Sequence, residues 1–138
     1  MPDTNAQAPN VMWRVAPYFV VDDVVATANF YRDKLGFDYE RLWGEPPSFT
    51  IVRRHRAMIM LRQLGAAGSM HPNRTPDPDD FVWDAYFWVD NADALHDQFQ
   101  ANGVKIVRPL CDQEYNMREF DIEDCNGFRL CFGHDTSR

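Results

Sequence analysis

Residues 16–37 read A-P-Y-F-V-V-D-D-V-V-A-T-A-N-F-Y-R-D-K-L-G-F and contain the signals that decide the fold. A short apolar run ends at Asp22 and Asp23, and either carboxylate can cap a helix by accepting a hydrogen bond from its free N–H groups. Apolar side chains then recur at helical spacing, and Gly36 suits the left-handed position that ends a helix. The stretch predicts a strand, a short helix and the start of a second strand.

A weaker copy of this pattern spans residues 84–106, D-A-Y-F-W-V-D-N-A-D-A-L-H-D-Q-F-Q-A-N-G-V-K-I. An aromatic-rich run ends at Asp90 and Asn91, either of which can cap the next helix, and Gly103 closes it. Two copies of one supersecondary unit in a short chain indicate a fold of two similar halves.

Apolar runs around the two copies predict further strands, because their side chains alternate between two faces. The expected strands are residues 13–21, 38–43, 49–53, 57–62, 81–89, 104–109, 117–123 and 128–132. Each half is therefore strand–helix–strand–strand–strand. We expect an α+β fold in which two βαβββ modules form a curved eight-stranded mixed sheet around a concave cavity, with the helices on the outer face.

The length of 138 residues favours one domain with its own core. We expect a disordered tail at residues 1–10, which lacks the basic and apolar segments of a signal peptide, and a single domain at residues 11–138. Repeat one then spans residues 11–62 and repeat two residues 81–134. A linker rich in glycine, proline and aspartate joins them at residues 63–80.

The charge balance and the cysteines limit the classes of partner. The net charge is −7 and the pI is near 4.9, which argues against nucleic acid because phosphate binding needs a basic face. An acidic surface suits a cationic ligand, although acidity also serves solubility. No apolar run has the length of a membrane span. Three cysteines without zinc spacing predict a reducing, cytoplasmic location.

Two motifs resemble those of the vicinal-oxygen-chelate superfamily, which includes glyoxalases, bleomycin-resistance proteins and extradiol dioxygenases. They are V-V-D-D-V-V-A-T-A-N-F-Y-R-D-K-L-G-F at residues 20–37 and R-E-F-D-I-E-D-C-N-G-F at residues 118–128. The resemblance covers about residues 11–133 and implies the paired βαβββ fold. It says less about the reaction, because one fold hosts many. Cys125 departs from the pattern, since the family has a proline there.

The resemblance also implies where a metal would bind. The ligand positions of metal-dependent members fall on Ala16, on or near Met60, on Asp84 and on Cys131. Alanine cannot ligate, and methionine and cysteine are soft donors that suit the divalent ions of these enzymes poorly. A shift of one residue, to Val15, Trp83 and Leu130, offers no better set. We therefore expect neither a metal nor another cofactor.

Without a metal, the chain resembles the bleomycin-resistance proteins, which are dimers that hold a flat, cationic, aromatic drug without altering it. Aromatic side chains can stack on flat rings, and carboxylates can meet a positive charge. The resemblance and the expected concave face together predict a ligand site at Trp43, Phe49, Met58, Met60, Asp84, Tyr86, Trp88, Tyr115, Glu119 and Asp121. We expect a homodimer, because two half-open cups leave much apolar surface exposed.

Other interpretations stay open. An enzyme of the same fold, such as a lyase, isomerase or dioxygenase, is the alternative function, and Asp84 or Glu119 is then the candidate general base. Met58 and Met60 also suit a core. Glu119 and Asp121 can equally be solvated, or paired with Arg118 or Arg129.

Overall fold

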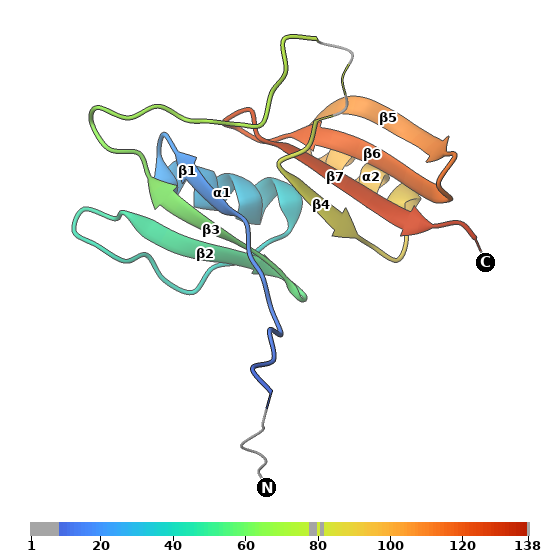
Figure 1. Cartoon of the computed structure of the whole chain (residues 1–138). Coiled ribbons are helices and arrows are strands. Elements are labelled where there is room, and N and C mark those ends of the chain that lie inside the picture. Colours follow the sequence, from blue (N-terminus) through green and yellow to red (C-terminus); the bar gives the residue numbers. More distant parts are fainter. Residues whose placement is uncertain (1–8, 78–79, 81, 138) are drawn as a thin grey trace, which may run out of the picture.

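The computed structural model describes residues 9–77, 80 and 82–137. In this part of the chain the elements alternate as two strand–helix units, each followed by further strands (Figure 1). In chain order they are β1 (Tyr18–Val21), α1 (Val24–Leu35), β2 (Phe49–Arg54), β3 (Ala57–Gln63), β4 (Ala85–Trp88), α2 (Ala92–Ala101), β5 (Lys105–Gln113), β6 (Met117–Glu123) and β7 (Arg129–Asp135).

The described strands form two mixed sheets, one from each half of the chain. The first has the order β1-β3-β2 and the second the order β4-β7-β6-β5. In each sheet the strand before the helix pairs in parallel with the last strand of its half, so Tyr18 lies opposite Met60 and Tyr86 opposite Cys131. The other pairs are antiparallel. Figure 1 shows α1 behind the first sheet and α2 behind the second, which leaves the opposite face of both sheets uncovered.

Both helices begin and end as their capping residues predict. The Asp23 carboxylate accepts a hydrogen bond of 3.0 Å from the backbone N–H of Ala26, and Asn91 caps α2 in the same way through Ala94. Gly36 follows α1 with a φ of 75°, a left-handed conformation that glycine adopts without steric cost.

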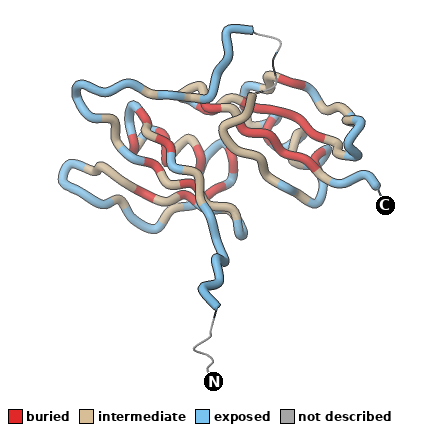
Figure 2. The backbone as a smooth tube through the Cα atoms, viewed as in Figure 1, coloured by how far each residue is buried: buried red, intermediate tan, exposed pale blue. Residues whose placement is uncertain are grey.

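The core lies between the sheets and their helices, where burial concentrates (Figure 2). It is shared by the two halves, because Phe19 of β1 stacks on Phe128 next to β7 with ring centroids 4.2 Å apart. The Tyr31 hydroxyl of α1 also donates a 2.6 Å hydrogen bond to Asp124, in the turn between β6 and β7. The halves are therefore joined by apolar packing and by a buried hydrogen bond.

The expected eight-stranded sheet is not what the structure describes at residues 38–43. There the chain makes two isolated bridges, Asp38 with Arg53 and Trp43 with Phe49, and no continuous ladder. Between them the Thr50 hydroxyl donates a 2.6 Å hydrogen bond to the Arg41 carbonyl, so a side chain satisfies a group that a strand would pair with backbone. The described residues give seven strands in two sheets.

The expected strand at 117–123 has the same bounds in the structure, and the other strands that form differ from their expected bounds at one end or both. The first starts at Tyr18 instead of residue 13, because Pro17 accepts a hydrogen bond from Met60 but has no N–H to extend the ladder. The strand expected at 81–89 is Ala85–Trp88, and residue 81 lies outside the described residues. The strand expected at 104–109 continues to Gln113, and its register shifts lie on both sides of Arg108.

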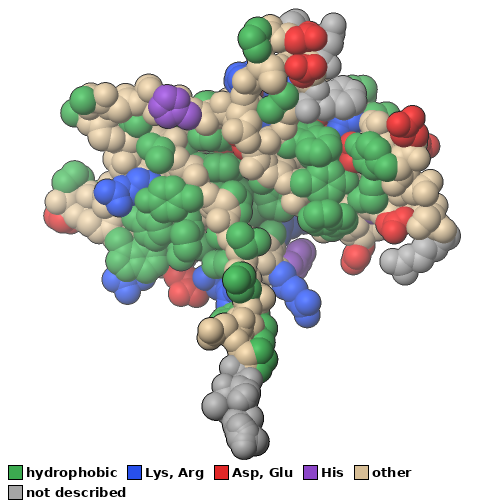
Figure 3. Space-filling view, in the orientation of Figure 1, with side chains coloured by type: hydrophobic (Ala, Val, Ile, Leu, Met, Phe, Trp, Pro, Cys, Tyr) green, Lys and Arg blue, Asp and Glu red, His purple; other side chains and the backbone are tan. Residues whose placement is uncertain are grey.

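The uncovered face of the two sheets, here called the front face, carries alternate residues of each strand. In β3, Ile59 and Leu61 are buried against the helix side, while Met58 and Met60 on the front face are half-buried. Figure 3 shows hydrophobic side chains gathered on this face over both sheets. Among the described residues, no helix is long and apolar enough to cross a membrane.

Candidate ligand-binding site

The front face of the second sheet presents a layer of aromatic side chains. We call Trp83, Tyr86, Trp88 and Tyr115 the aromatic surface. The ring centroids of Trp83 and Tyr86 are 5.1 Å apart, and those of Tyr86 and Trp88 are 4.9 Å apart. Trp88 is 78% exposed and Tyr115 is also exposed. Packing within the chain leaves much of these two rings exposed, so they can stack on a flat ligand.

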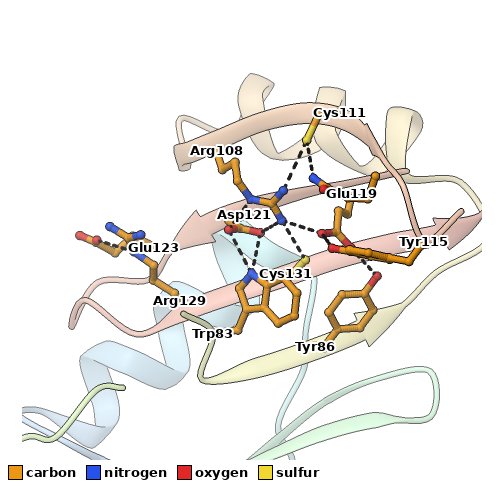
Figure 4. Close-up of polar contacts among 11 residues, drawn as sticks. Trp83, Tyr86, Arg108, Cys111, Tyr115, Glu119, Asp121, Glu123, Arg129 and Cys131 are labelled. Atoms are coloured by element: carbon orange, nitrogen blue, oxygen red, sulfur yellow. Dashed lines mark hydrogen bonds and ion pairs between the residues drawn. The ribbon is translucent and has the colours of Figure 1, made fainter. Parts of the chain in front are cut away.

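A charged cluster lies beneath this surface, as Figure 4 shows. Arg108 of β5 donates hydrogen bonds of 2.8 Å from Nε and Nη2 to the two oxygens of Asp121, and one of 2.9 Å from Nη2 to Glu119. Glu119 is 0% exposed and Asp121 is 2% exposed, both on β6. Two carboxylates share one guanidinium, so the cluster carries one net negative charge under the rings.

The aromatic surface is tied to the charged cluster by its polar atoms. The hydroxyl groups of Tyr86 and Tyr115 both donate to the Glu119 carboxylate, the first at 2.7 Å. The Trp83 indole N–H donates to both oxygens of Asp121 at 3.1 Å. Each carboxylate therefore fixes the orientation of rings as well as that of the arginine.

The environment shifts the pKa values of these groups. Burial alone would raise the pKa of Glu119, but hydrogen bonds from Tyr115, Tyr86 and Arg108 hold it below its usual value. Burial and the hydrogen bond to Glu119 raise the pKa of both Tyr86 and Tyr115. Near neutral pH, Glu119 is ionised and both phenols keep their protons.

Gly133 makes the position of Tyr86 possible. It lies on β7 beside the tyrosine ring, and a Cβ placed on it would be 2.2 Å from the Tyr86 hydroxyl oxygen and 3.1 Å from the Glu119 Cβ. No side chain other than hydrogen fits in that space. The phenol can therefore cross β7 and reach Glu119 only because position 133 is a glycine.

The front face of the first sheet holds the remaining predicted ligand residues. The rings of Trp43 and Phe49 lie 5.6 Å apart, and the Arg41 guanidinium lies 4.7 Å from the Trp43 ring centroid. Met58 accepts a hydrogen bond from Arg14 at 3.4 Å, and Met60 is half-buried. The predicted residues therefore form two groups on two sheets, and arginines accompany the group on the first sheet.

Asp84 has a structural role in the described chain. Its carboxylate accepts hydrogen bonds from the backbone N–H of Asn73, at 2.5 Å, and from that of Arg129, at 2.8 Å. It thus fastens the connection between the halves to the start of β7. A cation or a substrate would have to compete with these two backbone donors.

A divalent metal does not fit the positions that the family resemblance implies. Ala16 precedes β1 and has no donor, and the Asp84 oxygens are held as described above. The Cys131 sulfur lies 3.7 Å from the Arg108 guanidinium, and burial and the Asp121 carboxylate raise the pKa of its thiol. A protonated thiol beside a fixed positive charge is a poor metal ligand. Within the described residues, no group of three or more His, Cys, Asp or Glu side chains is placed to hold a metal ion.

Sequence reasoning missed the residue at the centre of the cluster, Arg108. The partners that it offered for Glu119 and Asp121 are elsewhere: Arg118 pairs with Asp93 and Asp112, and Arg129 lies 3.7 Å from Glu123. Arginine within the otherwise apolar run I-V-R-P-L was the available signal, because a buried charge needs a partner on a neighbouring strand.

Comparisons with known proteins place the fold. The model of the Glyoxalase/Bleomycin resistance protein/Dioxygenase superfamily matches residues 14–132. A comparison with curated protein sequences finds no match. Among solved structures, a glyoxalase-related enzyme from Clostridium phytofermentans is 16% identical with a TM-score of 0.74, over 93% of this chain and 98% of that chain.

Two further structures show the range of proteins with this fold. TioX from Micromonospora sp. ML1 is 16% identical with a TM-score of 0.66, over 91% of this chain and 98% of that one. Lactoylglutathione lyase from Agrobacterium tumefaciens is 18% identical with a TM-score of 0.63, over 92% and 95%. At such identities the likeness concerns the fold alone. By the match of the family model, the chain belongs to the Glyoxalase/Bleomycin resistance protein/Dioxygenase superfamily.

Proposed function

We propose that the protein binds a flat aromatic, positively charged small molecule on the aromatic surface, without a metal and without altering it. The observation that supports this proposal is the layer of rings above a buried cluster with one net negative charge. Rings offer stacking area, and ring faces together with a nearby negative charge favour a cation. Sequestration of a drug of the bleomycin class is the specific form of this proposal.

The state of the carboxylates favours binding over general-base catalysis. Glu119 accepts hydrogen bonds from Arg108, Tyr86 and Tyr115, and its pKa is held low. A general base works best when its pKa lies near the operating pH and its lone pairs reach the substrate. Asp84, the other candidate base, is held by two backbone N–H groups.

A homodimer belongs to this proposal. Val11, Met12, Trp13 and Val15 precede β1 and are all exposed, in addition to Trp88 and Tyr115. Exposed apolar side chains at this density favour a partner surface, and a second copy would turn an open face into a cleft. Sedimentation equilibrium measures the mass directly, and a protein that stays monomeric at micromolar concentrations would contradict the dimer.

Calorimetric titration with a bleomycin-class drug tests the ligand. We expect saturable binding, and Trp88→Ala should weaken it roughly tenfold because one stacking contact is lost. Trp88→Phe is the matched control, since it keeps an aromatic ring and should retain most of the affinity. Chelation of metals with EDTA should leave the titration unchanged. Absence of binding at high micromolar drug would exclude this class of drug as the ligand. Equal affinities of the two Trp88 variants would exclude the aromatic surface as the binding site.

A further inference from the structure

A cavity of about 680 Å³ borders the proposed site. It is bounded by the tip of the β2–β3 hairpin on one side, and by the end of β4 and the start of α2 on the other. Figure 1 shows this hairpin tip beside the second module. The cavity shares Trp88 with the aromatic surface and none of its other rings. Its volume is in the range of small-molecule sites.

The floor of this cavity is aromatic and rigid. It is lined by Phe37, Phe87, Phe99 and Phe132. The rings of Phe87 and Phe132 are stacked with centroids 4.7 Å apart, and Phe99 meets Phe132 edge-on at 5.2 Å. Phe37, Phe99 and Phe132 are almost fully buried, and the half-buried Phe87 presents this packed layer to the cavity. Because Phe87 is fixed by the core rings behind it, a flat apolar group can lie against it without ordering new side chains.

The rim of the cavity is basic, in contrast to the chain as a whole. Arg54 reaches across it and is held in place by hydrogen bonds from Nη1 to the Leu35 carbonyl, at 2.8 Å, and from Nη2 to Gln98 Oε1, at 3.1 Å. It therefore presents a fixed positive charge next to the apolar floor.

The two residues that follow Arg54 add to this charge. His55 has a φ of 55° at the hairpin turn, and Arg56 comes next. In the described part of the chain, neither side chain has a hydrogen-bond or ion-pair partner. The acidic residue lining the cavity is Asp90, so two arginines face one carboxylate there. In a protein of net charge −7 this is a local site for an anion.

We propose that this cavity binds a small aromatic carboxylate, a class of ligand different from the cation proposed for the aromatic surface. The ring system lies against Phe87 on the cavity floor, and the carboxylate accepts hydrogen bonds from Arg56 and is attracted by Arg54. Guanidinium and carboxylate match in geometry and charge, and the apolar wall supplies the rest of the affinity. The site needs no metal and no second chain.

The test uses 2-naphthoate as the probe and the uncharged 2-naphthamide as its match. Calorimetry should give saturable binding of naphthoate, and amide NMR should shift Ala57, Ala94 and Gln98. Arg56→Gln should weaken naphthoate about fivefold, the value of a partly exposed ion pair, and should leave naphthamide within about twofold. Arg32→Gln, which removes the same charge from an exposed pair on α1, is the control and should change neither.

A second variant fills the cavity. Ala94 is exposed on its wall, so Ala94→Trp should fold normally and abolish binding of both probes. Naphthoate should still bind in Tyr86→Phe and together with the cationic ligand, which separates this site from the proposed function. Equal affinity for both probes in the wild type, or amide shifts confined to the aromatic surface, would overturn the proposal. A lower mass of Ala94→Trp in sedimentation would also overturn the proposal, because it would mean that a second copy of the chain fills the cavity.

Discussion

Replacing Arg108 by methionine would leave two buried carboxylates without their counter-charge. The guanidinium lies 2.9 Å from Glu119 and 2.8 Å from Asp121, and both carboxylates are almost fully excluded from solvent. Removal of one partner of a buried ion pair costs about 3 to 5 kcal/mol, because the remaining charge is uncompensated. We expect Arg108→Met to lower the free energy of unfolding by at least about 3 kcal/mol, a large part of the roughly 5 to 15 kcal/mol typical of a domain.

The pH dependence of this loss has a definite sign. In the wild type the pKa of Glu119 is lower in the folded than in the unfolded state, so its contribution is present above the unfolded pKa and is lost as the pH falls through the folded pKa. Without Arg108 the buried Glu119 carboxylate is repelled by that of Asp121 and lacks a cation, so its folded pKa rises above the unfolded one. The variant should therefore become more stable as the pH falls from about 7 to about 5.

Urea unfolding followed by tryptophan fluorescence measures both effects. The free energy of unfolding should fall on acidification of the wild type and rise on acidification of Arg108→Met. Arg118→Met is the matched control, because Arg118 pairs with Asp93 and Asp112 at the surface. Its replacement should lower the free energy of unfolding by less than about 1 kcal/mol. Equal costs for the two substitutions, or the same pH slope in wild type and Arg108→Met, would refute the account of the cluster.

Three further predictions concern Gly133 beside the cluster and two contacts that join parts of the chain. Gly133→Ala should displace the Tyr86 phenol and lower the free energy of unfolding by about 2 kcal/mol, and in a Tyr86→Phe background it should lower it clearly less. Additive losses of stability in urea unfolding would contradict the close contact. Asp84→Ala should increase proteolysis between the two halves of the chain while leaving ligand affinity within about twofold, and a tenfold loss of affinity would instead make Asp84 a ligand anchor. Tyr31→Phe should lower the free energy of unfolding by about 1 to 3 kcal/mol because Asp124 loses one of its buried donors, and a neutral effect would contradict the bond between the halves.

The parts of the fold that follow from neighbouring residues could be predicted from the sequence. Asp23 and Asn91 cap their helices and Gly36 ends the first one, because capping depends on a few consecutive positions. Alternation along β3 also separates Met58 and Met60, on the front face, from Ile59 and Leu61, which are buried. These features need no knowledge of what lies across the sheet.

The charged cluster could not be predicted in this way, because it depends on the register between strands. Arg108 lies opposite Asp121 after one register shift between β5 and β6, and Cys111 lies opposite Glu119 after a second. A shift of one residue turns a side chain to the other face, so the sequence left open whether Glu119 and Asp121 are solvated or paired with Arg118 or Arg129, and it did not offer Arg108. The strand expected at residues 38–43 was wrong for a related reason. The Thr50 hydroxyl binds the Arg41 carbonyl, and the sequence alone does not show that these two residues lie next to each other.

The cluster also bears on how the aromatic surface can work. A guanidinium beside Cys131 puts a fixed positive charge at a position where the family resemblance implies a metal ligand. That charge holds Glu119 and Asp121, and these in turn hold Trp83 and Tyr86 in place. The polar groups are thus engaged in positioning rings, which reduces the entropy lost when a flat ligand stacks on them. Trp88 lies outside this network and is 78% exposed, so its replacement should affect the ligand far more than the fold. This division between a rigid floor and an exposed ring is the physical basis for proposing a binding protein.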